Sequence, residues 1–385
     1  MKTDLLRKFV APEVVFGPES RKLAGKYARN LGAKKVLIIT DAGIIAAGWV
    51  KDVAIALEEA GVFYCVFSGI SPNPRSREVM LGAEFYRENG CDAIVAVGGG
   101  SPMDCAKGVG IVSSNNKDIL AFEGIDKIKV PSPPLIFIPT TAGTSSDVSQ
   151  FSIILNEEQR TKIAIISKAI VPDAALVDYQ TTTTMSPYLT ACTALDALVH
   201  AAEAFVSKAA SPLTDIHALE AIRLISRNLT PAIAHPENEK YKNMLMLASL
   251  EAGFAFSNAI LGAVHSMAHS AGGFLDLAHG ECNAMLFEHV INFNYDSAPE
   301  RYSAIASAMG IDTTALPTAA AKTALFERIK ELKKSAGITK TLTAAGVSSA
   351  DIKTLAHNAC NDPCLFTNPK PASERDIEVI YEEAM

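Results

Sequence analysis

Residues 93–107 read AIVAVGGGSPMDCAK: five apolar residues, three glycines, and then a segment typical of a helix start. A short run that is apolar throughout suits a strand covered on both faces, as in a parallel sheet. Ser101 is placed to cap the helix, Pro102 suits its first position, and Asp104 its third, where a capping box reaches back. The stretch therefore predicts a strand, a glycine loop and a helix, which together form a building unit of an α/β domain.

Other short apolar runs predict neighbouring strands of the same sheet. They lie at residues 35–40, 62–67 and 135–139. Segments 48–61 and 76–90 are long enough for the crossover helices that parallel strands require. We therefore expect a Rossmann-like α/β domain with helices on both faces of a parallel sheet.

The pattern changes after residue 150. Two extended runs, 151–155 and 161–167, flank a polar turn and predict a hairpin at the edge of the sheet. From residue 187 to about 357, Ala, Leu and Met recur at helical spacing, with breaks expected near Pro212, Pro231, Pro236, Gly280 and Pro317. We expect two domains, an α/β domain over residues 1–184 and an all-helical domain over 185–385.

Composition excludes several classes of protein. A net charge of -7 without a basic run argues against a nucleic-acid partner. No uninterrupted apolar segment is long enough to span a bilayer, and residues 1–17 lack the apolar stretch of a signal peptide, so no membrane association is expected. The 7 cysteines form no CxxC pair, which favours reduced thiols and a cytoplasmic protein over a disulfide framework.

Two loops at strand ends are suited to a dinucleotide. Gly99 and Gly100 let the backbone approach a diphosphate at the start of a helix, although an ordinary capped turn is the alternative. The hydroxyl-rich loop 140–147 follows another strand, where open α/β sheets place ligands. Asp41 ends the first predicted strand and either binds an adenosine ribose, favouring NAD over NADP, or caps a helix.

Four histidines and an aspartate suggest a metal site in the helical half. Asp196 and His200 lie one helical turn apart, as do His265 and His269, and His279 precedes a glycine at an expected helix break. Isolated histidines are more often core or surface residues, but several that converge with a carboxylate can hold a divalent ion. Oxygen and imidazole ligands without thiolate suit Fe(II), Zn or Mn, and ligand type does not choose among them.

These features together resemble the iron-containing (type III) alcohol dehydrogenase family. The resemblance extends over the whole chain and rests on Phe16-Gly17, Thr40-Asp41, Asn73-Pro74, GGGSPMDCAK from Gly98, PTTAGTSSD from Pro139, DALVHAAEAFVS from Asp196, HSMAHSAGGFLDLAHGECNAML from His265, Asn361-Asp362 and Thr367-Asn368-Pro369. It implies a dehydroquinate synthase-like fold, with an α/β nucleotide-binding domain followed by an all-helical metal-binding domain.

The resemblance also implies a role for individual residues. The metal ligands would be Asp196, His200, His265 and His279, and His269 would be the catalytic histidine beside nicotinamide and substrate. Cofactor contacts would come from Asp41, Asn73, Gly99, Gly100, Ser101, Asp104, Thr140, Thr141, Thr144, Phe151 and Lys162. Asp104 would form the floor of the nicotinamide site.

Five residues in three segments depart from the family's usual sequence. Ser145 and Asp147 stand in a loop that usually reads GTGSE, so a glycine is replaced and a carboxylate shortened. Ala278 replaces a proline before the last ligand histidine, and Phe287-Glu288 replaces Leu-Pro. These changes leave the geometry of the loop and of the substrate pocket open.

The implied function is reversible hydride transfer between NAD and a small primary alcohol, or its aldehyde, with a metal as Lewis acid and His269 as proton relay. A homodimer or larger homo-oligomer is expected by the same resemblance. Alternatives are a glycerol or polyol dehydrogenase, a lyase of the dehydroquinate synthase kind, and a non-enzymatic nucleotide-binding protein. The helical half lacks the Lys/Arg cluster such a lyase needs, and a complete ligand set argues against a non-enzymatic role.

Overall fold

The computed structural model describes residues 8–385, so part of the N-terminal segment inspected for a signal peptide lies outside the described residues. The apolar runs form a parallel sheet. Its six strands are, in spatial order, β1 (Glu13–Phe16), β9 (Ala174–Val177), β6 (Leu135–Pro139), β4 (Ala93–Gly98), β2 (Lys35–Ile39) and β3 (Phe63–Phe67). All four predicted strands are present, and β1 and β9 are additional.

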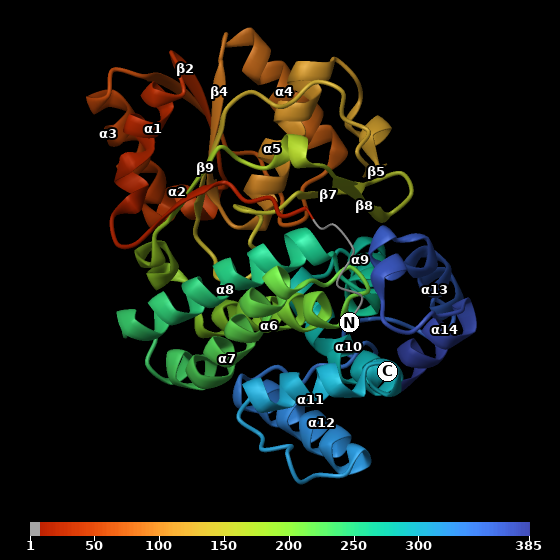
Figure 1. The fold of residues 1–385 in the computed structure, drawn as a ribbon. Helices are drawn as coiled ribbons and strands as arrows, with labels where there is room; N and C mark the ends of the chain where they lie inside the picture. Colours follow the sequence, from red (N-terminus) through yellow and green to blue (C-terminus); the bar gives the residue numbers. More distant parts are fainter. Residues whose placement is uncertain (1–7) are drawn as a thin grey trace.

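Alternate residues of these strands point to opposite faces, and each face is covered by helices. Val36 and Val95 pack on one face with α1 (Ala24–Asn30) and α3 (Trp49–Glu59). Leu37 and Ile94 pack on the other face with α4 (Ser76–Glu88) and α5 (Gly100–Asn115). Figure 1 shows these two helical layers on either side of the sheet. The predicted fold of the N-terminal part is confirmed.

The strand order fixes where a ligand can bind. The chain runs from β2 outward to β3 and then returns to β4 on the other side of β2. At such a reversal the loops that follow the two central strands diverge and leave a crevice at their carboxyl ends. Here those loops begin at Asp41 and at Gly99.

The hairpin is β7 (Phe151–Asn156) paired antiparallel with β8 (Thr161–Ile166), as predicted. It does not lie at the edge of the main sheet, and that part of the prediction is wrong. It forms a separate three-stranded sheet with β5 (Gly124–Ile125). One side of the hairpin packs into the core beside α5, through Ile154 and Ile163, so the hairpin fills a position between the two halves.

The remaining helical segments of the N-terminal part are short. They are η1 (Ser20–Leu23), α2 (Ala42–Ala47), η2 (Ile119–Phe122), η3 (Lys168–Ile170) and η4 (Tyr179–Thr184).

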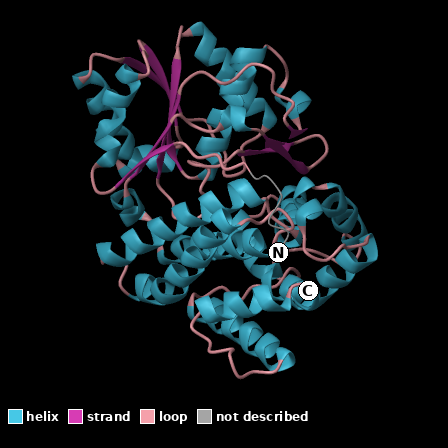
Figure 2. Cartoon of the chain, viewed as in Figure 1, coloured by secondary structure: helices cyan, strands magenta, loops and turns pink. Residues whose placement is uncertain are grey.

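Residues 185–385, all of them described, contain helices and no strand (Figure 2). These are α6 (Pro187–Val206), α7 (Pro212–Ala234), α8 (Glu239–Ala259), α9 (Ala263–Leu275), α10 (His279–Asn294), η5 (Tyr295–Ser297), α11 (Pro299–Ala308), α12 (Thr318–Ser335), α13 (Ile352–Asn361), η6 (Pro363–Thr367) and α14 (Glu374–Glu383).

One predicted helix break, near Pro231, is wrong. Pro231 lies inside α7, three residues before its end, where the missing N–H frees only the carbonyl of Arg227. The break expected near Gly280 is present at residues 276–278, between α9 and α10, and Gly280 itself is the second residue of α10 and lies against α6. Pro212 begins α7, Pro236 follows the end of that helix, and Pro317 caps α12, as expected.

One helix passes a looser test for a membrane span, although Asp196 and Glu203 interrupt its apolar residues. α6 has 20 residues and a mean hydropathy of 1.4, and it passes on length and composition. However, 94% of its most apolar stretch is buried inside the protein. α6 is therefore the central core helix of the helical half.

Candidate active site

One cavity of about 730 Å³ lies at the carboxyl ends of the strands, between the sheet and the helices. Its wall contains every residue predicted above to bind the metal, to bind the cofactor or to act in catalysis. Those from the α/β half are Asp41, Asn73, Gly99, Gly100, Ser101, Asp104, Thr140, Thr141, Thr144, Phe151 and Lys162, and those from the helical half are Asp196, His200, His265, His269 and His279.

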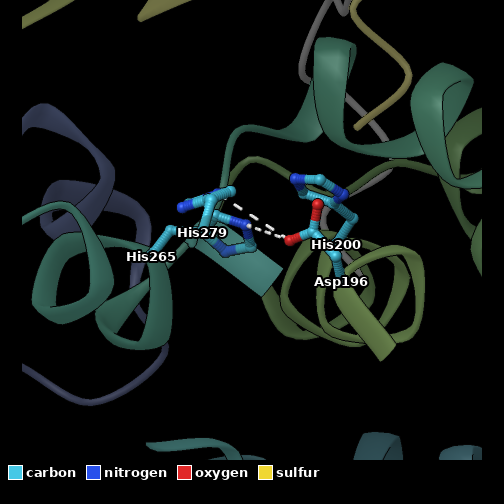
Figure 3. Close-up of side chains that lie close together, drawn as sticks. All are labelled: Asp196, His200, His265 and His279. Carbon is cyan, nitrogen blue, oxygen red and sulfur yellow. Dashed lines mark ion pairs between the residues drawn. The ribbon is translucent and has the colours of Figure 1, made fainter. Parts of the chain in front are cut away.

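Four side chains converge at one point of this cavity (Figure 3). Asp196 and His200 lie one turn apart on α6, His265 is on α9, and His279 is the first residue of α10. One potential ligand atom from each lies within 4.8 Å of the other three. The Asp196 Oδ1 atom is 3.9 Å from Nε2 of His265 and 3.7 Å from Nε2 of His279. Such a set has the composition and spacing that a divalent ion requires.

The imidazoles of this cluster are held neutral, which is the form that binds metal. Burial and the neighbouring His200 lower the pKa of His265 well below its usual value. Burial and the neighbouring Lys162 do the same to the pKa of His279, and burial lowers the pKa of His200. Nδ1 of His200 and Nδ1 of His279 have no hydrogen-bond partner among the described residues.

Glu203 orients His265. Its carboxylate accepts hydrogen bonds from the backbone N–H groups of Gly262, Val264 and His265 at the start of α9, and from Nδ1 of His265 at 2.6 Å. With Glu203 ionised, the hydrogen of a neutral His265 lies on Nδ1, and the lone pair of Nε2 then faces Asp196. A carboxylate that orients an imidazole in this way is the usual outer partner of a metal-binding histidine.

Asn283 lies beside three of the four residues. Its Nδ2 donates to Asp196 Oδ1 at 2.6 Å and lies 3.1 Å from Nε2 of His265 and 3.3 Å from Nε2 of His279. One amide hydrogen goes to Asp196, which leaves one for the imidazole nitrogens, so a single amide group occupies the space between these three ligand candidates. This donor set therefore fits a divalent cation.

His269 lies one turn beyond His265 on α9 and does not join the four. Its ring stacks on His279, with ring centroids 5.2 Å apart, and its Nδ1 is 2.8 Å from Oδ2 of Asp362. Spacing alone had left His269 a possible ligand. The structure places it beside the cluster, paired with its own carboxylate.

The glycine loop and the hydroxyl loop pack against each other. A Cβ on Gly99 would lie 3.0 Å from Thr141, and one on Gly100 would lie 2.9 Å from Thr144. The glycines are therefore needed for this close approach as well as for access to a ligand. α5 begins at Gly100 and directs its N-terminus into the cavity, an arrangement that favours a phosphate.

The capping prediction for this loop is wrong. Gly99 is the N-cap of α5, and Ser101 is already inside the helix, where its hydroxyl donates to the carbonyl of Pro72. Asp104 does not reach back to the helix start. It accepts hydrogen bonds from the Ser146 hydroxyl at 2.6 Å and from the backbone of Ile153 at 3.2 Å. Asp104 thereby links three segments of the cavity floor.

Lys107, one turn further along α5, is fully buried below this floor. Its Nζ donates to Ser146 Oγ at 3.1 Å, to the carbonyl of Ser149 at 2.9 Å and to the carbonyl of Phe151 at 2.6 Å. Burial lowers the pKa of Lys107 to about 8 and raises that of Asp147 to about 6. Lys107 thus holds the hydroxyl loop and the start of β7 in place.

Two cofactor candidates also have structural partners. Asp41 is the N-cap of α2, where its Oδ1 accepts from the backbone of Ile44 at 3.0 Å. Asn73 donates from Nδ2 to Asp276 Oδ1 at 2.6 Å, which joins the α/β half to the loop after α9. Asp41 thus caps α2 at the mouth of the crevice through Oδ1. Its other oxygen, Oδ2, takes no part in the capping hydrogen bond.

The departures from the family's usual sequence leave the cluster intact. Ser145 has a φ of 49°, a left-handed conformation that favours glycine, and its hydroxyl donates to the carbonyl of Ser249 at 2.5 Å. Ala278 has a φ of -62°, which is the value a proline would impose. Phe287 and Glu288 are buried outside the cavity, and Glu288 pairs with Lys333.

Four residues of the site were missed in the sequence: Lys107, Glu203, Asn283 and Asp362. All four lie inside the quoted motifs, but the motifs alone assign them no role. Only a folded chain shows their partners, because Glu203 lies 62 residues from His265 and Asp362 lies 93 residues from His269.

Comparison with known proteins agrees with this geometry. Residues 11–179 match the family model described as iron-containing alcohol dehydrogenase, and residues 190–385 match that of the C-terminal part of the Fe-containing alcohol dehydrogenase family. The chain is 40% identical to 1,3-propanediol dehydrogenase of Citrobacter freundii, covering 98% of both chains. It is 36% identical to NAD-dependent methanol dehydrogenase of Bacillus methanolicus, covering 98% of this chain and 99% of that one.

Solved structures give the same result. A crystal structure of 1,3-propanediol oxidoreductase matches with a TM-score of 0.96 at 38% identity, covering 99% of this chain and 100% of the other. An alcohol dehydrogenase from Oenococcus oeni matches with a TM-score of 0.95 at 36% identity, with the same coverage. The chain belongs to the iron-containing alcohol dehydrogenase family.

Proposed function

We propose that the chain catalyses reversible hydride transfer between NAD and a small primary alcohol or diol, with the aldehyde as the other substrate. The observation that carries this proposal is the single cavity that joins the four-residue cluster to the glycine loop of the parallel sheet. Asp196, His200, His265 and His279 would hold one divalent ion, Fe(II) by family and Zn or Mn as alternatives. Bound there, the ion would supply Lewis-acid polarisation of the alcohol oxygen, and NAD in the same cavity would be the hydride acceptor.

The α/β half binds and orients the dinucleotide. The N-terminus of α5 at Gly100 and the hydroxyls of Thr140, Thr141 and Thr144 offer hydrogen bonds to a diphosphate. Asp41 accepts from ribose hydroxyls and repels a 2′-phosphate, which favours NAD over NADP. Asn73, Gly99, Ser101, Asp104, Phe151 and Lys162 complete this wall of the cavity.

His269 handles the proton. Its Nδ1 is engaged by Asp362, so its other nitrogen, Nε2, is the one available to a substrate in the cavity. We assign to Nε2 the acceptance of the alcohol proton, directly or through water, and its return in the reverse reaction.

The apolar side chains that line the cavity beside the four-residue cluster favour a small alcohol as substrate. Phe256 stacks on His200, with ring centroids 4.3 Å apart, and Leu261 lines the cavity nearby. Apolar side chains this close to the cluster limit the size of the carbon chain and exclude water. Relatives that act on 1,3-propanediol and methanol are consistent with this size class.

The proposal includes the organisation of the chain. The domain boundary falls between residues 184 and 185, after η4 and before α6. All seven cysteines are free thiols, which is consistent with a reducing, cytoplasmic location. Assembly as a homodimer or larger homo-oligomer is part of the same proposal and is tested by light scattering.

The test is an assay of anaerobically purified protein loaded with Fe(II), or separately with Zn or Mn. We expect NAD-dependent oxidation of short primary alcohols and 1,3-propanediol, loss of activity after chelation, and recovery on adding metal. A preference for glycerol and secondary polyols would replace the substrate assignment with that of a polyol dehydrogenase. No change in NADH with any alcohol or aldehyde, in metal-loaded protein that binds NADH, would contradict the enzymatic function.

A further inference from the structure

Asp362 lies where α13 meets η6, and both of its oxygens have a partner. Oδ1 accepts from the backbone N–H of Cys364 at 2.8 Å and thereby caps η6. Oδ2 is 2.8 Å from Nδ1 of His269. Both side chains are buried, with 4% of His269 and 7% of Asp362 exposed, so water does not compete strongly for this contact.

Burial raises the pKa of Asp362, but His269 and the N–H of Cys364 outweigh burial and hold that pKa below its usual value. The group is therefore a carboxylate, which accepts hydrogen bonds and has none to donate. Its contact with His269 forms only if the hydrogen of a neutral imidazole is on Nδ1. The lone pair is then on Nε2.

The same arrangement occurs one turn earlier on α9, where Glu203 accepts from Nδ1 of His265. The two imidazoles differ in what surrounds Nε2. In His265 this atom faces Asp196 and Asn283. His269 stands outside the four-residue set, and its ring lines the cavity. Each of these two α9 histidines therefore has a carboxylate at Nδ1. Nε2 of His265 faces the four-residue cluster, whereas Nε2 of His269 is not part of that cluster.

We propose that Asp362 is a positioning residue that locks His269 in the Nδ1–H form, so that Nε2 receives the proton of the alcohol. This inference rests on the proposed function of His269. A hydrogen bond from Nδ1 to a carboxylate also fixes the ring's rotation, which keeps Nε2 at a constant place relative to the substrate.

The first test is Asp362→Asn in the metal-loaded enzyme. The Asn oxygen can still cap η6 at Cys364, but its NH₂ group then faces Nδ1 of His269 and drives the hydrogen to Nε2. We expect kcat to fall by roughly 100-fold or more, while metal content and NADH affinity stay unchanged. Glu251→Gln is the matched control, because Glu251 pairs with Nδ1 of His217 away from the cavity. That variant should retain wild-type kcat.

A double-mutant cycle separates positioning from general support of the fold. In a His269→Ala background, Asp362→Asn should change kcat by less than about 3-fold, because the group that it positions is gone. Equal losses in both backgrounds would show that Asp362 acts on structure alone and would overturn the proposal.

A spectroscopic readout keeps the inference testable without turnover. In zinc-loaded protein with ¹⁵N-labelled histidine, the His269 signals, assigned from their absence in His269→Ala, should show hydrogen on Nδ1. In Asp362→Asn they should show hydrogen on Nε2. An Nε2–H form in the wild type would overturn the proposal. An inactive wild type with the Nδ1–H form would instead refute the proposed function and leave the lock established.

Discussion

At the residue scale, Glu203 both caps the start of α9 and orients a predicted metal ligand, His265. One carboxylate accepts three backbone N–H groups at the start of α9 and the Nδ1 hydrogen of His265. Glu203→Gln leaves one oxygen and adds an NH₂ group that opposes these donors. We expect the affinity for Fe(II) or Zn to fall by roughly 10–100-fold, as for other outer partners of metal ligands, measured by competition with a chelator.

Glu288→Gln is the control for that experiment. Glu288 is also a buried carboxylate, paired with Lys333, but it lies outside the cavity. It should lower thermal stability and leave metal affinity unchanged. Equal metal affinities in wild type and Glu203→Gln would show that His265 is oriented without Glu203.

The buried Asp147 predicts a pH dependence of stability. Burial raises its pKa from the usual 3.8 to about 6, so the folded protein keeps this proton to higher pH than the unfolded chain does. Its stabilising contribution is complete below about pH 3.8 and is lost as the pH rises through 6. Asp147→Asn should therefore gain stability relative to wild type between about pH 5 and pH 7.5, by roughly 1.5 kcal/mol.

Urea unfolding of the metal-free proteins at the two pH values measures this gain. Asp118→Asn, which exchanges one exposed N-cap of η2 for another good capping residue, should show no such dependence. A constant difference between Asp147→Asn and wild type at both pH values would mean that the carboxyl is not shifted in the folded state.

Residue types and short spacings predicted the candidate ligands but not their separate tasks. Asp196 and His200, and likewise His265 and His269, are one turn apart, so spacing puts each pair on one helix face. His269 lies outside the four-residue cluster and pairs with Asp362, which stands at the end of α13. Lys107 was missed for the same reason, because its partners Ser149 and Phe151 lie 42 and 44 residues away in the sequence.

At the scale of elements, a glycine brings two helices together at the cluster. A Cβ on Gly280 of α10 would lie 2.5 Å from the carbonyl oxygen of Cys192 and 3.3 Å from Cβ of Asp196, both on α6. Helix propensity alone would favour Gly280→Ala by roughly 1 kcal/mol. The clash with backbone outweighs this, so the variant should move His279 away from Asp196 and lower both metal affinity and thermal stability.

Gly108→Ala is a matched comparison. Gly108 lies in α5, and its added methyl would come 2.8 Å from the side chain of Val79, within the α/β half. It should affect stability and leave metal affinity as in the wild type. Wild-type metal affinity in Gly280→Ala would contradict the role assigned to the contact of α10 with α6.

The same packing explains which elements could be predicted. Strands β2, β3, β4 and β6 are apolar throughout because both faces are covered, and such runs stand out in a sequence. β1 and β9 have only four residues each, too few for a pattern. The hairpin was recognised from its own residues, but its place depends on β5 and α5, which local sequence does not encode.

At the scale of the whole molecule, the site exists only because two differently built halves meet. Gly273 of α9 lies so close to β8 that a Cβ would be 2.9 Å from the backbone nitrogen of Lys162. This contact carries Lys162 toward the cluster, and the bond from Asn73 to Asp276 closes the cavity on another side. Composition predicted the two halves, whereas their relative placement follows from surface shape and could be expected only from the resemblance.

The central claim is that one divalent ion binds to Asp196, His200, His265 and His279 beside the dinucleotide loops. Anomalous X-ray diffraction at the iron edge, from crystals grown anaerobically with Fe(II) and NAD, tests it most directly. We predict one strong peak per chain within bonding distance of that carboxylate and those three imidazoles, and none in Asp196→Ala crystals. A peak at other residues, or the same peak in the variant, would contradict the claim.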